Sequence, residues 1–109
     1  MEYSNIILEK QNSVATLRLN RPDALNALSP ELLEEFLAAT RQVAEDQEMK
    51  ALVIRGEGRA FCAGADLLYL ESLLDDLSQM PDYVRLLNQC FCQLEALPVP
   101  TLALVQGFA

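Results

Sequence analysis

Four consecutive apolar residues, Ala51-Leu52-Val53-Ile54, lie between the charged Lys50 and the loop-forming sequence Gly56-Glu57-Gly58. A short apolar run with such boundaries is typical of a strand that is buried on both faces of a sheet. The segment before it has helical periodicity, and a helical crossover is the usual connection between parallel strands. This pattern predicts an α/β fold that is built by crossovers.

The helical segment has a clear start and a clear end. Ser29 is a suitable N-cap and Pro30 a suitable first-turn residue. Apolar or small residues then recur along one face until the polar sequence Asp46-Gln47-Glu48 interrupts them, and they are Leu33, Phe36, Leu37, Thr40 and Ala44. We therefore expect an amphipathic helix of about four turns that starts near Pro30.

Further elements are expected on both sides of this unit. Strands Ile6–Leu8 and Val14–Leu19 flank a polar turn and predict a β-hairpin, in which Ala15, Leu17 and Leu19 face a core. Later segments predict a helix from Leu67 to Leu77, an interruption at 78–82, a helix from Tyr83 to Leu97 before Pro98, and a buried strand Thr101–Val105. A buried strand followed by so few residues leads us to expect that the chain has been cut short.

Composition excludes several classes of partner. The 109 residues carry a net charge of −8, and no basic cluster is present to steer the chain toward nucleic acid or an anionic membrane. Three cysteines do not suit a disulfide framework, and reduced thiols favour a cytoplasmic protein. Cys90 and Cys92 point to different sides of a helix and the chain has no His, so no metal site is expected.

Two segments differ from ordinary scaffold sequence. The first is Leu19-Asn20-Arg21-Pro22-Asp23-Ala24-Leu25-Asn26-Ala27-Leu28, and the second is Arg59-Ala60-Phe61-Cys62-Ala63-Gly64-Ala65-Asp66-Leu67. The first resembles the L-N-R-P-x-x-x-N-A-L signature of the enoyl-CoA hydratase/isomerase (crotonase) family, and the second resembles that family's F-x-A-G-A-D-L loop. The end of the chain, Leu104-Val105-Gln106-Gly107-Phe108-Ala109, is similar to the family's A-V-N-G-x-A sequence. Three matches in order over nearly the whole chain make the resemblance specific.

The resemblance implies a fold and a site. The fold is a crotonase-like (ClpP/crotonase) spiral of strand-strand-helix repeats, of which residues 1–109 are the N-terminal part of a single domain. In the family, the N–H at the position of Ala65 binds the thioester oxygen of an acyl-CoA and stabilises the enolate. The remaining substrate-binding positions that it implies are Asp23, Ala24, Leu25 and Ala27 for the adenine end, Ala63 for the pantetheine channel, and Gly64, Asp66 and Leu67 beside Ala65.

The residues of the second segment support this chemistry independently. Gly64 can adopt backbone angles that other residues avoid, and a helix start at Ala65 and Asp66 presents N–H groups to a negative charge. The alternative is a plain strand-to-helix turn in which Gly64 and the alanines serve packing and Asp66 is an ordinary N-cap. For the first segment, the alternative is an ordinary strand-to-helix connection that contains a Pro.

Some positions depart from the family pattern. Leu68 stands where many relatives have a Lys that reaches the CoA phosphates, so Arg21 and Arg59 are the nearby cations that remain. Gln106 replaces a common Asn. The G-G-G segment that completes the oxyanion hole, and the Glu residues that act as acid and base, would follow Ala109.

We expect an enzyme that hydrates or isomerises an enoyl-CoA, with CoA as part of the substrate, no separate cofactor, and a homo-oligomeric state of trimers or hexamers. Two alternatives stay open. One is a module that binds acyl-CoA or a partner subunit without chemistry, and the other is an interaction or structural domain.

Overall fold

A β-hairpin begins the fold in the computed structural model of this chain, which describes residues 3–107 and 109. Strands β1 (Ile6–Gln11) and β2 (Val14–Leu19) pair antiparallel, from Ile6 opposite Leu19 to Gln11 opposite Val14. The hairpin is confirmed, but β1 extends three residues beyond the predicted Leu8. Only Asn12 and Ser13 form the turn, with φ of 52° and 68°, because the polar residues before them still pair with β2.

Strand β2 has the predicted apolar face. Ala15 and Leu17 have no exposed surface and Leu19 is 3% exposed, whereas the residues between them are half-buried. Successive side chains of a strand point to opposite faces, so this alternation shows that one face of the sheet is covered.

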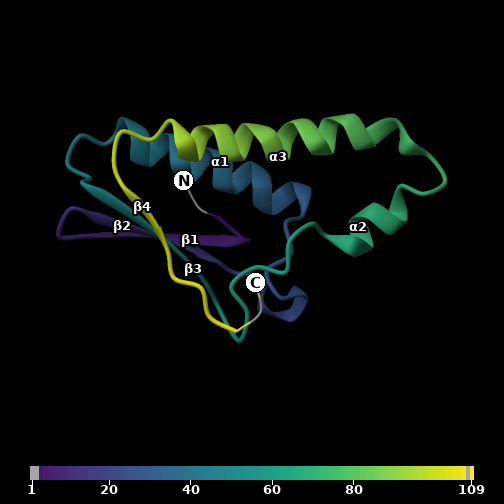
Figure 1. The fold of residues 1–109 in the computed structure, drawn as a ribbon, viewed down its shortest axis with the longest axis horizontal. Coiled ribbons are helices and arrows are strands. Elements are labelled where there is room, and N and C mark those ends of the chain that lie inside the picture. Colours follow the sequence, from purple (N-terminus) through teal and green to yellow (C-terminus); the bar gives the residue numbers. More distant parts are fainter. Residues whose placement is uncertain (1–2, 108) are drawn as a thin grey trace.

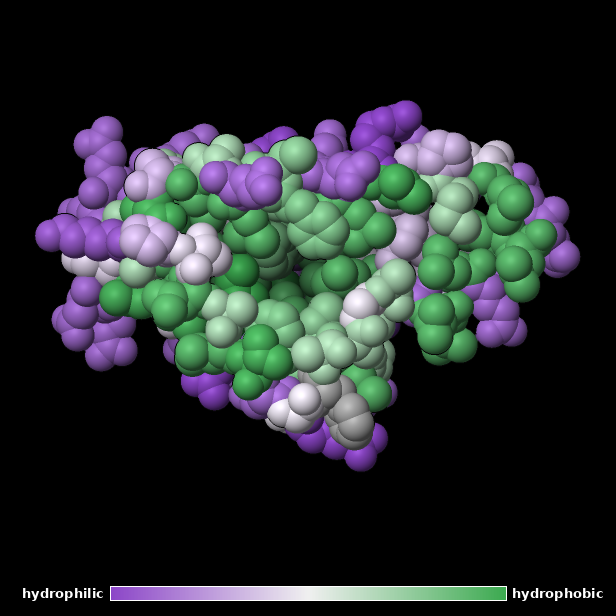
Figure 2. Space-filling view, in the orientation of Figure 1, coloured by the Kyte–Doolittle hydropathy of each residue, from purple (hydrophilic) through white to green (hydrophobic). Residues whose placement is uncertain are grey.

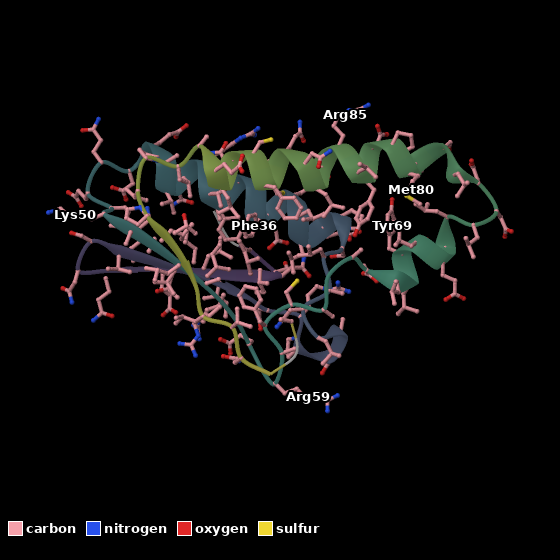
Figure 3. The ribbon with its side chains drawn as sticks, in the orientation of Figure 1. Phe36, Lys50, Arg59, Tyr69, Met80 and Arg85 are labelled. Atoms are coloured by element: carbon pink, nitrogen blue, oxygen red, sulfur yellow. The ribbon has the colours of Figure 1, made fainter. Side chains whose placement is uncertain are left out.

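Helix α1 (Pro30–Glu45) covers that face, with the start and the length that the sequence predicts. The Ser29 hydroxyl accepts a hydrogen bond from the Leu32 N–H at 3.2 Å, which satisfies one of the free donors of the first turn. Phe36 projects from α1 toward the sheet, between the helices and the strands (Figure 3). Core packing therefore fixes the orientation of α1.

Strand β3 (Ala51–Gly56) pairs parallel with β2, so the predicted helical crossover is confirmed. The expectation that this strand is buried on both faces is wrong. Leu52, Ile54 and Gly56 are buried, but Ala51 and Val53 are half-buried and Arg55 is exposed. Both long helices lie on the same side of the sheet (Figure 1), and the other face carries polar side chains.

The segments after β3 differ from the predicted helices. Helix α2 (Leu67–Ser72) is short, the 3₁₀ turn η2 (Leu77–Gln79) follows, and α3 (Met80–Glu95) begins three residues before the predicted start. The residues read as an interruption include Pro81, which lies in the first turn of α3 and is compatible with a helix start. The leucine repeat does not extend α2, because Leu67 and Leu74 are 76% and 71% exposed and bury no helix face.

Strand β4 (Thr101–Ala103) completes a sheet with the order β1-β2-β3-β4 and pairs parallel with β3. The predicted strand Thr101–Val105 is two residues shorter in the structure, and it is exposed at every position instead of buried. The apolar sequence predicted burial, but β4 is an edge strand that pairs on one side only, so its side chains stay exposed.

The core lies between the sheet and the helix pair α1 and α3, and its central residues include Leu17, Leu32, Leu33 and Leu52. The face in Figure 2 is apolar over its middle and is hollowed between α3 and β4. A cavity of about 150 Å³ lies among apolar residues of both layers, including Phe61, which is half-buried. Across residues 3–107 and 109, no helix has the length and apolarity needed to cross a membrane.

Candidate functional site

The first motif segment follows β2 as the 3₁₀ turn η1 (Pro22–Ala24) and two left-handed residues, Leu25 and Asn26, with φ of 52° and 57°. Asn26 is fully buried. Its Oδ1 accepts a hydrogen bond from the Arg21 N–H at 2.8 Å, and its Nδ2 donates to the carbonyl groups of Glu57, Ala60 and Phe61 at 3.0, 3.0 and 3.2 Å. One amide side chain thus joins the first segment to the loop after β3.

The two motif segments are neighbours in space. The Ala63 N–H donates to the Leu25 carbonyl at 2.9 Å, and the Leu28 N–H donates to the Gly64 carbonyl at 2.8 Å. Leu28 and Ala65 form an isolated parallel β-bridge. These bonds bring together residues that are about forty positions apart in the sequence.

Gly64 adopts φ of 99°, one of the backbone conformations that a glycine can take and other residues avoid. Ala65 follows and is exposed, and within residues 3–107 and 109 its N–H has no hydrogen-bond acceptor. The Gly64 carbonyl and the Ala65 N–H belong to one planar trans peptide, so they point in opposite directions. Because that carbonyl accepts a hydrogen bond from Leu28, the Ala65 N–H points away from Leu28.

Asp66 is the N-cap of α2, the role that the alternative interpretation of this segment gave it. Its Oδ1 accepts hydrogen bonds from the N–H groups of Leu68 and Tyr69 at 3.1 and 3.2 Å, and its Oδ2 lies 3.1 Å from Nη1 of Arg21. The sequence led us to expect free N–H groups at the helix start itself. Asp66 satisfies two of those donors. Among the described residues, the N–H of Leu67 at the helix start and the N–H of Ala65, one residue before the cap, have no acceptor.

A pocket of about 190 Å³ lies beside Ala65, and its walls come from both motif segments. Seven residues line it: Ala24, Ala27, Ala63, Ala65, Asp66, Leu67 and Leu68. Six of these are among the nine site residues that the resemblance implies. Of the other three, Asp23 is exposed on η1, and Leu25 and Gly64 hold the loop through their carbonyl groups.

Tyr83 also belongs to this region, although its sequence pattern predicted only that it lies on the apolar face of a helix. It is 3% exposed, and its hydroxyl accepts a hydrogen bond from the Asp66 N–H at 3.2 Å and donates to the Leu28 carbonyl at 2.5 Å. Burial raises the pKa of Tyr83. No local signal distinguishes such a tyrosine from a core residue, because its partners lie on other elements.

The cations near the site have different surroundings. Nη1 of Arg21 donates to the Ala27 carbonyl at 2.6 Å as well as to Asp66, so the structure uses this guanidinium to join the motif segments. Arg59 is exposed in the loop after β3 and points outward (Figure 3). Gln106, which follows β4, contacts the same region: its Nε2 donates to the carbonyl groups of Gly56 and Gly58 at 2.9 and 2.8 Å.

The cysteines lie in different environments. Cys90 is 1% exposed and Cys92 is exposed, which confirms that they point to different sides of α3. Burial raises the pKa of Cys62, whose Sγ accepts a hydrogen bond from the Gly64 N–H at 3.4 Å. In the described part of the chain, no three His, Cys, Asp or Glu side chains are grouped to hold a metal ion.

Comparisons with known proteins agree with this arrangement. The family model described as enoyl-CoA hydratase/isomerase matches residues 9–109. The chain is 38% identical to a crotonyl-CoA hydratase of Syntrophomonas wolfei and 37% identical to a short-chain-enoyl-CoA hydratase of Clostridium acetobutylicum. Both alignments cover 100% of this chain, but only 42% and 41% of the relatives.

Solved structures show the same fold. The crystal structure of an enoyl-CoA hydratase/isomerase from Xanthobacter autotrophicus Py2 superposes with a TM-score of 0.89 and 34% identity. The match covers 97% of this chain and 40% of that one, and an enoyl-CoA hydratase of Bacillus anthracis matches to a similar extent, with a TM-score of 0.89. The fold is therefore the crotonase fold, and the chain belongs to the enoyl-CoA hydratase/isomerase family.

Proposed function

We propose that this chain binds an acyl-CoA thioester beside Ala65 and stabilises the enolate that forms when the substrate is hydrated or isomerised. The observation that carries the proposal is the exposed Ala65 N–H, which has no acceptor within the described residues and belongs to a residue of the pocket wall. A donor held in this way can bind a carbonyl oxygen at no cost to the fold.

The chemistry follows from the charge that develops during the reaction. Negative charge moves onto the carbonyl oxygen when the α-carbon of a thioester loses a proton. The same happens when a nucleophile adds to the β-carbon of an enoyl thioester. A fixed N–H stabilises that oxygen more strongly in the transition state than in the ground state, and one such donor contributes about 3 kcal/mol in other enzymes. The small side chains of Ala63, Gly64 and Ala65 let the thioester approach the backbone.

The rest of the substrate would follow the pocket walls. We assign the adenine end of CoA to the backbone of Asp23, Ala24, Leu25 and Ala27, and the pantetheine arm to Ala63. Arg21 is held by Asp66 and the Ala27 carbonyl, so Arg59 is the cation that remains to meet the CoA phosphates. The proposed chemistry requires no metal or redox cofactor, because CoA is part of the substrate.

The test replaces the amide itself. In the full-length protein, Ala65→Pro removes the N–H, and we expect kcat for enoyl-CoA hydration to fall about 100-fold or more. Ala65→Gly is the matched control, because it removes the methyl group and keeps the donor, so its kcat should stay within about threefold of the original. Circular dichroism would verify that both variants fold. Activity of Ala65→Pro equal to that of the Gly variant would refute the assigned role.

A second candidate is a module that binds acyl-CoA without turnover. Asp66 is the single carboxylate of the pocket wall, and Arg21 and two backbone N–H groups occupy its oxygens, so it does not serve as an acid or a base. Calorimetric titration with an acyl-CoA, run beside the hydration assay, separates the two functions. Binding with no turnover favours the module, and failure to bind any CoA ester excludes both.

A further inference from the structure

Tyr83 links three parts of the fold through one oxygen atom. Its side chain comes from α3, and its hydroxyl hydrogen-bonds to the Leu28 carbonyl, just before α1, and to the Asp66 N–H, just before α2. The ring of Tyr69 lies against the ring of Tyr83, with centroids 5.0 Å apart and planes inclined at 55°. Tyr69 belongs to α2, and its side chain extends toward α3 (Figure 3). The phenol of Tyr83 is thus held by two hydrogen bonds and one ring contact.

The hydroxyl lies at the bridge that joins the two motif segments. In the parallel bridge between Leu28 and Ala65, one bond runs from the Leu28 N–H to the Gly64 carbonyl at 2.8 Å. The other pair of groups that such a bridge brings together is the Asp66 N–H and the Leu28 carbonyl. Both of these groups hydrogen-bond to the Tyr83 hydroxyl, at 3.2 and 2.5 Å. Tyr83 therefore adds a side-chain link between the two groups at the bridge.

Ala65 lies between these two anchors. The peptide before it is held through the Gly64 carbonyl, and the peptide after it is held through the Asp66 N–H. Gly64 itself restrains the loop little, because no atom lies within 4 Å of the position that a Cβ would occupy there. The direction of the Ala65 N–H consequently depends on the hydrogen bonds on either side of it.

The hydroxyl is suited to this task at neutral pH. Donation to the Leu28 carbonyl requires the phenol to keep its proton, and burial raises the pKa of Tyr83 above its ordinary value. The hydroxyl is buried between elements and does not line the pocket beside Ala65, so it does not meet the substrate directly.

We propose that Tyr83 is a positioning residue, whose hydroxyl aims the Ala65 N–H at the thioester oxygen by linking the Leu28 carbonyl to the Asp66 N–H in the loop before α2. This inference rests on the proposed role of Ala65. It assigns Tyr83 an effect on the chemical step and none on the binding of the CoA portion.

The test removes only the oxygen, with Tyr83→Phe in the full-length protein. We expect kcat for enoyl-CoA hydration to fall about tenfold or more, since a small misplacement of a catalytic group is costly, while KM changes less than about twofold. The control is Tyr69→Phe, because the Tyr69 hydroxyl makes no hydrogen bond to the residues that the structure describes, so kcat should be unchanged. Equal kcat values for the two variants would overturn the inference.

A spectroscopic measurement reports on the donor without turnover. The absorption of a bound aromatic enoyl-CoA moves to longer wavelength as its carbonyl is polarised. We expect this shift to be smaller in Tyr83→Phe than in Tyr69→Phe at saturating ligand. An undiminished shift in a folded Tyr83→Phe protein contradicts the inference, and so does a protein that loses its fold, because the hydroxyl is then a requirement for stability.

Fluorinated tyrosine at position 83 gives a second test that keeps the hydroxyl in place. Fluorination lowers the pKa of the phenol, so we expect kcat to fall at a lower pH than in the unmodified protein, as the proton donated to Leu28 is lost. An unchanged pH profile argues against the inference. If Ala65→Pro abolishes activity and the Tyr83 variants do not, only the positioning role fails; if Ala65→Pro is active, the proposed function itself fails.

Discussion

At the scale of single residues, the site depends on side chains that hold backbone segments together. Asn26 satisfies one N–H and three carbonyl groups from segments that are more than thirty residues apart. The close approach also explains Gly56, because a Cβ there would lie 2.4 Å from the carbonyl oxygens of Ala60 and Phe61. The first motif therefore encodes a junction between loops as well as a binding surface.

Removal of the Asn26 amide should destabilise the whole fold. We expect Asn26→Ala to lower the free energy of unfolding by about 2–4 kcal/mol, because several buried polar groups lose their partner. Asn12→Ala is the matched control, since Asn12 has a similar φ of 52° but is exposed, and it should cost no more than about 1 kcal/mol. Urea denaturation measures both values. Similar losses in the two variants would show that backbone conformation, rather than the hydrogen bonds, makes Asn26 important.

At the scale of elements, α3 positions the site from a distance. It packs against α1 through residues such as Cys90, whose Sγ donates to the Leu33 carbonyl at 3.3 Å, and it carries Tyr83 to the junction of the motif segments. Its N-terminal boundary lies three residues before the predicted one, since Pro81 and Asp82 read equally well as an interruption. The loop before α2 is thus held by α3, a helix whose first residue was not evident from the local sequence.

The orientation of α3 can be tested by its two cysteines. We expect alkylation of the native protein at mildly alkaline pH to modify Cys92 and to spare Cys90, which is 1% exposed. Peptide mass spectrometry identifies the modified thiol, and alkylation of the urea-unfolded chain is the control in which both react. Preferential modification of Cys90 in the native state would mean that α3 is rotated relative to the structure.

Cys90 also gives a prediction for alkaline stability. Burial raises the pKa of this thiol to about 11, whereas the thiol of the unfolded chain has its ordinary pKa near 9. Between these values the folded state binds the proton and the unfolded state does not, so the free energy of unfolding falls as the pH rises from about 9 to 11. Cys90→Ala should show a shallower decline in urea titrations over this range. An equally steep decline would assign the effect to other groups.

At the scale of the whole molecule, one feature dominates the surface. Large apolar side chains are exposed on α2, α3 and β4 and around η2, and the same face carries a hollow (Figure 2). The exposed residues are Leu67, Leu68, Leu74, Leu77, Val84, Phe91, Leu102, Leu104 and Val105. Contiguous apolar surface of this kind is unusual on a monomer and marks regions that contact other protein.

The 109-residue chain on its own should therefore bind apolar dyes and self-associate. We expect 8-anilinonaphthalene-1-sulfonate fluorescence to rise on addition of the chain, and light scattering to detect species larger than a monomer. Replacement of the exposed Leu102 and Leu104 with Ser should reduce both signals, whereas Ser at the exposed polar positions Gln89 and Glu95 should not. A monomeric chain that does not increase the fluorescence of the dye would contradict this interpretation of the surface.

Local sequence by itself determined much of this protein. The apolar alternation of Ala15, Leu17 and Leu19, the cap at Ser29 and the left-handed Gly64 follow from short-range chemistry, and each is found in the structure. Of the nine residues that the motif resemblance named, six line one pocket. Tertiary structure alone decided which face of β3 is covered, where α3 begins, and that Asn26, Arg21 and Tyr83 hold the loops around Ala65. These features depend on hydrogen bonds and packing between residues far apart in the chain, which a local pattern does not contain.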